Sequence, residues 1–416
     1  MLTPPPTIVS VSDSESYLKW AARLLSGSGT EGPASAHGLQ RGQLWLLHNP
    51  ILPSAAQIEA ALAGSAFGPG DVRLLSFAEF PAALRALGDG GPDVVVGAAT
   101  GPVVERVFAA AATLPRRPAL ISGLPGVGLP AREKGMRFRA LGDAFIAHSY
   151  AEQAAYQEIC RQLDLPTRIL VNRLPLLRST EPPRRRSQDE ERRCLVFAPQ
   201  AKVPAERAQR EAILKALAGY AAAFPGHRVI VKVRALAGEQ QTHHEEYAYP
   251  VLLAELERRG EIPAGRLEVA AGPLSDYLTA DAALVTVSST AALESIDAGL
   301  PTGIISEFGM NEELLTLAFR GSGMELSLAE LAAGRIPFPH TRWLEDNYFH
   351  QQPEPLFAEL ERLAADSRAG RLAPLGSRLR ASRFRMLRAE ARLRAPKPVV
   401  RTYQAVAGTV RRLRAR

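Results

Sequence analysis

Two successive series of short β-branched runs, each run followed by a longer amphipathic segment, constrain the fold of this chain more than any other feature. Such alternation is typical of a parallel sheet wrapped by helices. The chain has 416 residues, more than one hydrophobic core usually organises, so each series is expected to form a domain of its own. The sequence therefore predicts an α/β fold in which two Rossmann-like domains face a cleft.

The predicted elements divide the chain into four segments. Residues 1–175 form the N-terminal domain, 176–193 a polar linker, 194–335 the C-terminal domain, and 336–416 a set of C-terminal helices that ends in a basic tail. The predicted strands are 8–11, 44–47, 72–75, 94–96, 119–121 and 144–146 in the first series, and 194–197, 228–233, 267–269, 284–287 and 302–305 in the second.

Charge and apolar content narrow the class of protein. No apolar run approaches the roughly 20 residues that span a bilayer, and the start MLTPPPTIVSVSD lacks the pattern of a signal peptide, so a cytoplasmic protein is expected. The net charge of +7 is concentrated after Arg380, and no nucleic-acid-binding motif is visible, so nucleic acid is not an expected partner. Cys160 and Cys194 lack the paired spacing of a zinc or redox site.

The basic tail interleaves apolar residues with arginines. On a helix the apolar residues fall near one stripe and the arginines lie mostly at the end, which suits a surface held against anionic lipid headgroups. Peripheral contact with an anionic membrane is one interpretation, and a basic end that only solubilises the chain is the other. The residues concerned are Val399, Val400, Tyr403, Val406 and Val410, with arginines at positions 401, 411, 412, 414 and 416.

The strongest local motif is VTVSSTAALESIDAGLP, residues 285–301. Ser288, Ser289 and Thr290 follow a buried strand and precede a helix, and open α/β sheets bind ligands at the carboxyl ends of their strands. Backbone N–H groups, the helix dipole and the hydroxyls would hold a phosphate or pyrophosphate there. Alternatively, Ser289 or Thr290 only caps the helix. One turn further on, Glu294 either accepts a hydrogen bond from a ribose or sugar hydroxyl or pairs with a basic neighbour.

This motif carries a resemblance. The stretch 265–305 resembles the C-terminal domain of bacterial capsule Kdo- and polysialyltransferases and of CDP-glycerol glycerophosphotransferases, in which a strand, a Ser-Ser/Thr pair and an acidic helix bind the donor's phosphates. More closely, IVSVSDSESYLKWA, GLPGVGLP and VKVRALAGEQQTHHEE resemble a group of bacterial glycosyltransferases of the GT-B architecture. The resemblance covers most of the chain. It implies a nucleotide-activated sugar donor bound by the C-terminal domain, and final helices that cross back to the N-terminal domain.

One departure from that pattern concerns the second strand of the C-terminal domain. The polysaccharide transferases commonly carry His-Pro after this strand, where the present chain has Arg234-Ala235, so the role of that histidine is not transferred. Cations at a strand's carboxyl end suit a diphosphate, and a nearby histidine suits the leaving phosphate, although a charged strand end is often only solvated. The candidates are Lys232, Arg234 and His243, followed by Gln200 and Lys202 in the loop after the first strand.

In the N-terminal domain, Ser12, Asp13 and Ser14 follow the first strand. An inverting transferase needs a carboxylate or histidine to take the acceptor proton, so Asp13 is the first candidate for the base and capping of the next helix is its alternative. The segment ISGLPGVGLPAREKG, residues 121–135, lacks the dinucleotide fingerprint, so a nicotinamide cofactor is not expected. Its Gly126 permits close backbone approach to a ligand. Further candidates are Arg132 and Lys134 for an anionic acceptor or lipid-linked phosphate, and His148 as a reserve base.

Three hypotheses for function follow. The first is a transferase that moves a sugar from a nucleotide-activated donor to a polysaccharide, glycolipid or other cell-envelope acceptor. The second is a polyol-phosphate transferase or a nucleotide-sugar epimerase on the same fold, and the third is a non-catalytic relic. No D-x-D motif stands at a predicted strand end, so the enzyme is expected to need no metal. No cofactor is expected besides the activated sugar, which is a substrate.

Overall fold

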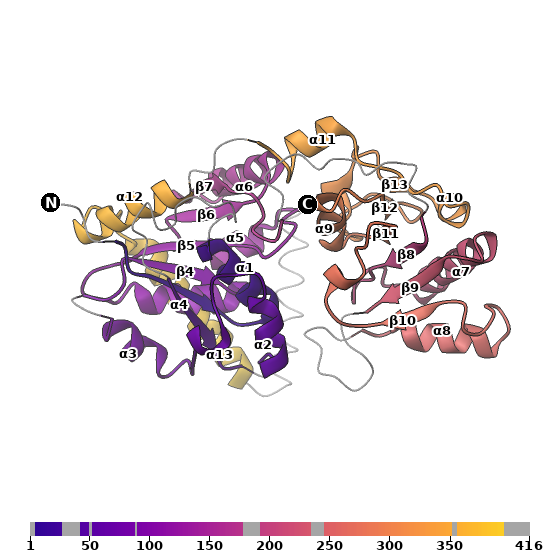
Figure 1. Ribbon diagram of the computed structural model, residues 1–416. Coiled ribbons are helices and arrows are strands. Elements are labelled where there is room, and N and C mark those ends of the chain that lie inside the picture. The colour runs from indigo at the N-terminus through magenta and orange to yellow at the C-terminus, as the bar shows by residue number, and fades with distance from the viewer. Residues whose placement is uncertain are drawn as a thin grey trace, which may run out of the picture.

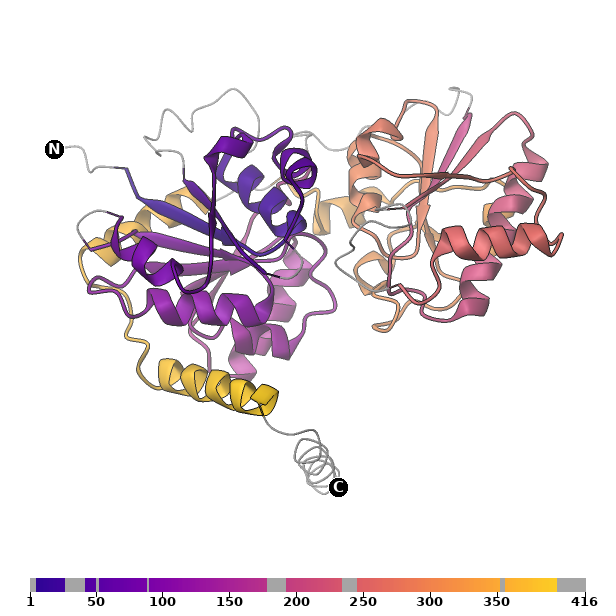
Figure 2. The same ribbon diagram turned by 90° about the horizontal axis from the view of Figure 1, so that it is seen from below.

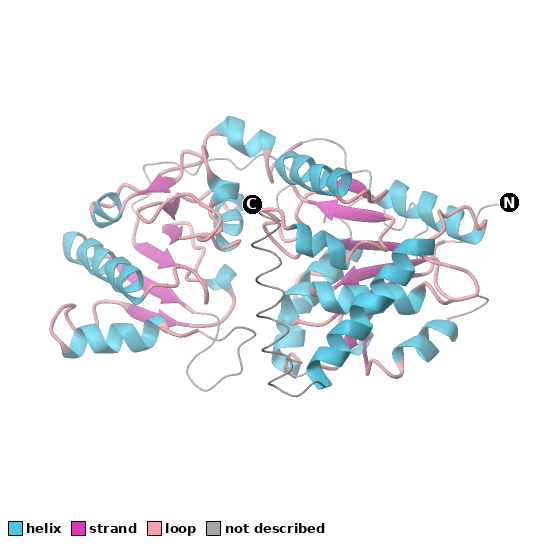
Figure 3. Ribbon diagram, turned by 180° about the vertical axis from the view of Figure 1, so that it is seen from behind, coloured by secondary structure: helices cyan, strands magenta, loops and turns pink. Residues whose placement is uncertain are grey.

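The computed structural model describes residues 5–26, 42–49, 52–87, 90–177, 192–233, 245–351 and 356–394. These residues form two α/β domains that lie side by side (Figure 1). Helices cover both faces of the sheets (Figure 3). The predicted fold class, two Rossmann-like domains with C-terminal helices, is confirmed.

The N-terminal domain contains a seven-stranded parallel sheet with the order β3-β2-β1-β4-β5-β6-β7. Several of its strands are buried along their whole length, as expected when helices cover both faces of a parallel sheet. The strands are β1 (Ile8–Ser12), β2 (Gln43–Leu47), β3 (Val72–Leu75), β4 (Val94–Ala98), β5 (Ala119–Gly123), β6 (Ala144–Ala147) and β7 (Arg168–Val171). The helices are α1 (Glu15–Ser26), α2 (Ala55–Leu62), α3 (Phe80–Arg85), α4 (Gly101–Ala111), α5 (Glu133–Phe138) and α6 (Tyr150–Gln162), with a 3-10 turn η1 (Pro69–Asp71).

The C-terminal domain repeats this topology in a six-stranded parallel sheet with the order β10-β9-β8-β11-β12-β13. The strands are β8 (Cys194–Phe197), β9 (Arg228–Lys232), β10 (Glu268–Ala270), β11 (Ala282–Thr286), β12 (Thr302–Ile305) and β13 (Glu325–Leu326). The helices are α7 (Arg207–Ala223), α8 (Tyr249–Arg258), α9 (Ala291–Asp297) and α10 (Leu328–Ala332), with 3-10 turns η2 (Leu274–Asp276) and η3 (Leu317–Phe319).

The strand order reverses at one point in each sheet, between β1 and β4 and between β8 and β11. Ser12 lies beside Ala98 in the first pair, and Phe197 beside Val285 in the second, so the two loops that leave each pair start at nearly the same level. Ligands of open α/β sheets bind in the crevice at such switch points. Both domains therefore offer a binding position at the carboxyl ends of their central strands.

Two elements of the N-terminal domain were not predicted. Strand β7 and helix α5 have four and six residues, too few for a periodic pattern to distinguish them from a loop. In the C-terminal domain, the segment after β10 forms a short 3-10 turn, η2.

Helix α11 (Thr341–Asp346) packs against the C-terminal domain, where Trp343 Nε1 donates to the Ala318 carbonyl at 3.3 Å. The last two helices, α12 (Leu356–Arg368) and α13 (Gly376–Arg394), return to the N-terminal domain, as expected, and Figure 2 shows α13 beneath that domain. Arg368 at the end of α12 pairs with Asp93 beside β4 at 2.7 Å, and Ser382 of α13 donates a hydrogen bond to Glu105 of α4 at 2.9 Å. No helix within the described ranges is long and apolar enough to cross a membrane.

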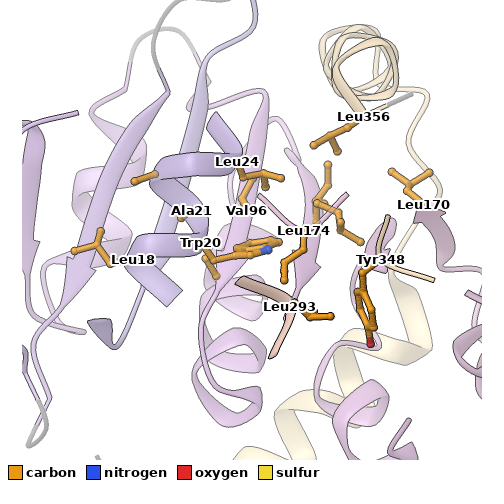
Figure 4. Packing of buried hydrophobic residues seen from close by; sticks show 14 of the residues in the cluster. Leu18, Trp20, Ala21, Leu24, Val96, Leu170, Leu174, Leu293, Tyr348 and Leu356 are labelled. Atoms are coloured by element: carbon orange, nitrogen blue, oxygen red, sulfur yellow. The ribbon is translucent and has the colours of Figure 1, made fainter. Parts of the chain in front are cut away.

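One hydrophobic core joins the two domains (Figure 4). It contains Leu18 and Trp20 of α1, Leu293 of α9, Tyr348 in the loop after α11, and Leu356 at the start of α12, all nearly fully buried. Helix α9, which begins at the switch point of the C-terminal sheet, is thereby held close to α1, which begins at the switch point of the N-terminal sheet.

Candidate active site

A cleft of about 460 Å³ lies between the two domains. From the N-terminal domain it is lined by residues 124–130 after β5, together with Arg132, Met136, Arg139 and Tyr156. From the C-terminal domain it is lined by Gln200 after β8, Ser288 and Thr290 after β11, and Leu315. Its volume lies in the range of small-molecule sites.

The C-terminal wall of the cleft is built at the switch point between β8 and β11. Ser288 Oγ donates to Gln200 Oε1 at 2.5 Å, and Gln200 Nε2 donates to the Ser288 carbonyl at 3.1 Å. Below them, Thr286 Oγ1 donates to the Ala198 carbonyl at 2.6 Å. These bonds connect the two loops, so Gln200, Ser288 and Thr290 share one polar surface.

The hydroxyls of Ser289 and Thr290 have different roles. Ser289 Oγ accepts a hydrogen bond from the Ala291 amide at 3.2 Å and is 9% exposed, so it satisfies the start of α9 and does not line the cleft. Thr290 occupies the N-cap position without a side-chain capping bond and does line the cleft. The capping alternative therefore describes Ser289, whereas the Thr290 side chain faces the cleft.

Glu294 of α9 faces the other domain. Its carboxylate lies 4.0 Å from the Lys19 ammonium of α1, and both side chains are partly exposed. The basic-neighbour alternative is thus present in the structure, as a loose ion pair across the domain boundary.

Asp13 lies at the switch point of the N-terminal sheet. Its Oδ2 accepts from the Thr100 amide at 2.9 Å and from Thr100 Oγ1 at 2.5 Å, and Thr100 is the N-cap of α4. The positive end of that helix favours a carboxylate. Asp13 is 3% exposed, and its Oδ1 has no hydrogen-bond partner among the described residues. It therefore stabilises the start of α4 rather than capping α1, and it lies behind the cleft wall. Ser12 and Ser14 beside it are also buried.

The glycine-containing loop after β5 approaches two other parts of the chain closely. A Cβ built on Gly126 would lie 2.5 Å from Thr290 Cγ2 in the opposite wall. A Cβ on Gly128 would lie 2.9 Å from the carboxyl carbon of Glu152. Glu152 Oε1 accepts hydrogen bonds from the Gly128 amide at 2.7 Å and from the Tyr348 hydroxyl at 2.7 Å. These two bonds hold the loop against α6 and against the loop that follows α11. A larger residue at either position would displace the side chain that it meets.

The comparisons with known proteins identify the family. The protein family described as "Putative glycosyltransferase (DUF6716)" matches residues 8–363. The chain belongs to this family. Its membership confirms the resemblance that the sequence motifs indicated.

Solved structures share the fold of this family member. The structure of S. aureus MnaA with UDP is similar with a TM-score of 0.53 and 10% identity, over 88% of this chain and 98% of that chain. A UDP-N-acetylglucosamine 2-epimerase gives a TM-score of 0.52 and 14% identity, over 88% of this chain and 95% of that chain. Identities this low show a common GT-B fold alone. No curated protein sequence matches the chain.

Two predicted residues of the N-terminal domain are engaged in other contacts. Arg132 pairs with Glu312 of the C-terminal domain at 2.8 Å in an exposed ion pair between the two domains. His148 is fully buried, accepts from Trp20 Nε1 at 3.1 Å, and its Nδ1 lies 2.9 Å from the Asn172 carbonyl. His148 therefore lies in the core of this glycosyltransferase-family chain and does not line the cleft.

Several other candidates lie away from the cleft or outside the described residues. Lys232 ends β9, next to β8, at the same edge of the sheet as Gln200. Lys202 and Lys134 are exposed and do not line the cleft. Arg234, His243 and the basic tail 399–416 lie outside the described residues.

Three further residues of the cleft region are candidates for a functional role and were not predicted from the sequence. Arg139 lines the cleft with only 4% of its surface exposed, Glu152 positions the glycine loop, and Glu312 pairs with Arg132. Burial raises the pKa of the Tyr156 hydroxyl, and this neutral group donates to the Gly128 carbonyl at 2.8 Å. Nothing in the local sequence marks these residues, because their partners are distant along the chain.

Proposed function

We propose that this chain transfers a sugar from a nucleotide-activated donor to a polysaccharide, glycolipid or other cell-envelope acceptor. The observation that carries the proposal is a cleft lined from both domains at the carboxyl ends of both sheets. Two substrates can meet there, one on each wall. Membership in a family described as glycosyltransferase supports this reaction class, and the UDP bound in the similar MnaA structure supports a nucleotide-linked donor.

In this proposal the C-terminal wall binds the donor. Thr290 and Gln200 offer hydroxyl and amide donors to the phosphates, Ser288 orients Gln200 beside them, and Lys232 lies at the same edge of the sheet. Arg234 and His243 are proposed to complete this site, His243 at the leaving phosphate. No cofactor besides the activated sugar is proposed, and the reaction is proposed to proceed without a metal ion. The basic tail is proposed to hold the enzyme at an anionic membrane surface.

Asp13 is the proposed base. Its buried Oδ1 lacks a partner among the described residues. Because Asp13 lies behind the cleft wall, this role requires the acceptor hydroxyl to reach Oδ1 past the Ala99–Thr100 peptide. Asp13→Asn keeps the size and the oxygen that Thr100 contacts. The variant is expected to bind nucleotide normally and to lose turnover.

A second candidate function is epimerisation of a nucleotide sugar, because a UDP-N-acetylglucosamine 2-epimerase is among the structures that share the fold. Epimerases need acid and base groups near the sugar. Among the described residues that line the cleft, the charged ones are Arg132 and Arg139, and neither is an acid. Transfer needs one base, for which Asp13 is proposed, whereas an epimerase would need further acid and base groups near the sugar.

Calorimetric titration with UDP-, CDP- and CMP-linked compounds tests the donor site. Mass spectrometry of reactions with donor alone, and with donor plus lipid-linked and oligosaccharide acceptors, separates the two reactions. Transfer predicts a product only when an acceptor is present, and it predicts the same rate with EDTA. An epimer formed from donor alone, or no binding by any nucleotide, would refute the proposal.

A further inference from the structure

We infer that the N-terminal wall of the cleft binds an oxyanion carried by the acceptor, a phosphate or a carboxylate, through Arg139. This inference rests on the proposed function, since it assigns the acceptor's chemical class. It starts from a charged side chain that is almost completely buried yet reaches the cleft.

The guanidinium of Arg139 is held by uncharged groups. Its Nε donates to Ser122 Oγ at 3.0 Å, its Nη1 to the Gly135 carbonyl at 3.1 Å, and its Nη2 to the Ala99 carbonyl at 3.2 Å and the Tyr17 hydroxyl at 3.4 Å. Burial raises the pKa of Tyr17, so this hydroxyl stays neutral. An arginine stays protonated in proteins. The four contacts therefore orient the positive charge without neutralising it.

One N–H of Arg139 remains for a ligand. The guanidinium has five N–H groups, and four are used in the contacts above. The remaining one is on Nη1. A Cβ built on the cleft-lining residue Gly135 would meet this Nη1, at 3.9 Å, and no other described atom within 4 Å outside its chain neighbours and the backbone of α5. The space beside Nη1 is therefore open, and an oxyanion can reach it.

The acids near this wall are turned away from the cleft. Asp13 lies on the far side of the Ala99–Thr100 peptide, whose carbonyl accepts from Arg139 and whose N–H donates to Asp13. Glu152 lies behind the glycine loop and accepts from the amides of Gly128 and His148. Neither carboxylate lines the cleft. A buried cation that faces a cleft is costly unless an anion compensates it, and here the ligand would supply that anion.

The position of Arg139 assigns this anion to the acceptor rather than to the donor. Its contacts come from the ends of β4 and β5, from α1 and from α5, all in the N-terminal domain. The proposed donor wall, Gln200, Ser288 and Thr290, belongs to the C-terminal domain. Arg132, the other cation of the wall, is already paired with Glu312.

The experiment titrates inorganic phosphate, sodium glucuronate and neutral glucose into the full chain by calorimetry at constant ionic strength, with and without saturating nucleotide. Arg139→Gln is the direct variant, but it also removes four buried contacts and can fail to fold. Gly135→Asp therefore places a carboxylate in the open space beside Nη1 while Arg139 stays in position. Gly135→Asn is its matched neutral control.

Phosphate or glucuronate, but not glucose, is expected to bind the native chain and Gly135→Asn. Binding to Gly135→Asp is expected to be weaker by roughly tenfold or more, the usual value of a charge-assisted bond. Binding of phosphate would indicate a phosphorylated acceptor, and binding of glucuronate would indicate a carboxylated one. No binding of either anion, equal binding by the two Gly135 variants, or displacement of the anion by nucleotide would overturn the inference. If no nucleotide binds, the proposed donor site fails, while the comparison of the Gly135 variants still reports on Arg139.

Discussion

Gly126→Ala provides a direct test of the interdomain cleft. The added Cβ would lie 2.5 Å from Thr290 Cγ2, whereas carbon atoms in contact are about 3.5–4.0 Å apart. The φ angle of Gly126 lies outside the left-handed region, so alanine fits the backbone and only the contact with the opposite wall is disturbed. The β-branched threonine has few alternative rotamers, so the walls are expected to separate by roughly 1 Å.

The cost follows from this overlap. Overpacking of this kind costs about 1–3 kcal/mol, which corresponds to a loss of affinity of roughly fivefold to 150-fold for a ligand that contacts both walls. The thermal midpoint is expected to fall as well, because a buried core joins the two domains and resists their separation. Thr290→Ser removes Cγ2 and keeps the hydroxyl, so the double variant Gly126→Ala/Thr290→Ser is expected to regain most of the lost affinity.

The assay is calorimetric titration of the native chain, both single variants and the double variant with the tightest-binding nucleotide of the panel. Small-angle scattering reports any widening between the domains. Native-like binding by Gly126→Ala would show that the two walls do not act together. A loss that Thr290→Ser leaves uncorrected would place the effect of alanine in the loop itself rather than in the contact.

Three further predictions concern the two hydroxyls at the start of α9, the buried residue His350 after α11, and the basic tail. Ser289→Ala is expected to lower the free energy of unfolding by about 1 kcal/mol, because the hydrogen bond to the start of α9 is lost. Thr290→Ala is expected to weaken nucleotide binding with little change in the thermal midpoint. Calorimetry and thermal melts separate the two effects, and the reverse pattern would contradict the assigned roles. Burial lowers the pKa of His350 to about 4. As the pH falls below 6.5, the unfolded chain therefore takes up a proton at this histidine while the folded chain does not. The free energy of unfolding is expected to fall by up to about 3 kcal/mol between pH 6.5 and pH 4. Urea titrations at pH 7 and pH 4.5 are expected to show a smaller loss for His350→Phe, and an unchanged loss would exclude His350 as its source. A chain that ends at Pro396 is expected to co-sediment less with phosphatidylglycerol vesicles than the full chain, and equal partition would dispose of the membrane role of the tail.

The fold was predictable because its signals are local. A run such as residues 282–286 is apolar enough to be buried on both faces, and a hydroxyl-rich turn followed by a helix marks the end of such a strand wherever it occurs. The same local pattern indicated Ser288 and Thr290, which do line the cleft. It could not tell which hydroxyl caps α9 and which faces the ligand, because both stand within one turn and the choice depends on side-chain direction.

The sequence by itself determined the two α/β series and the strand ends where polar residues gather. Only the tertiary structure decided which of these residues face the cleft. His148 became a buried partner of Trp20, whereas Arg139 reached the cleft through contacts with α1, β4 and β5. The bond between Glu152 and Tyr348 joins residues 196 positions apart. Such contacts depend on the path of the whole chain, and no pattern within a short window of sequence encodes them.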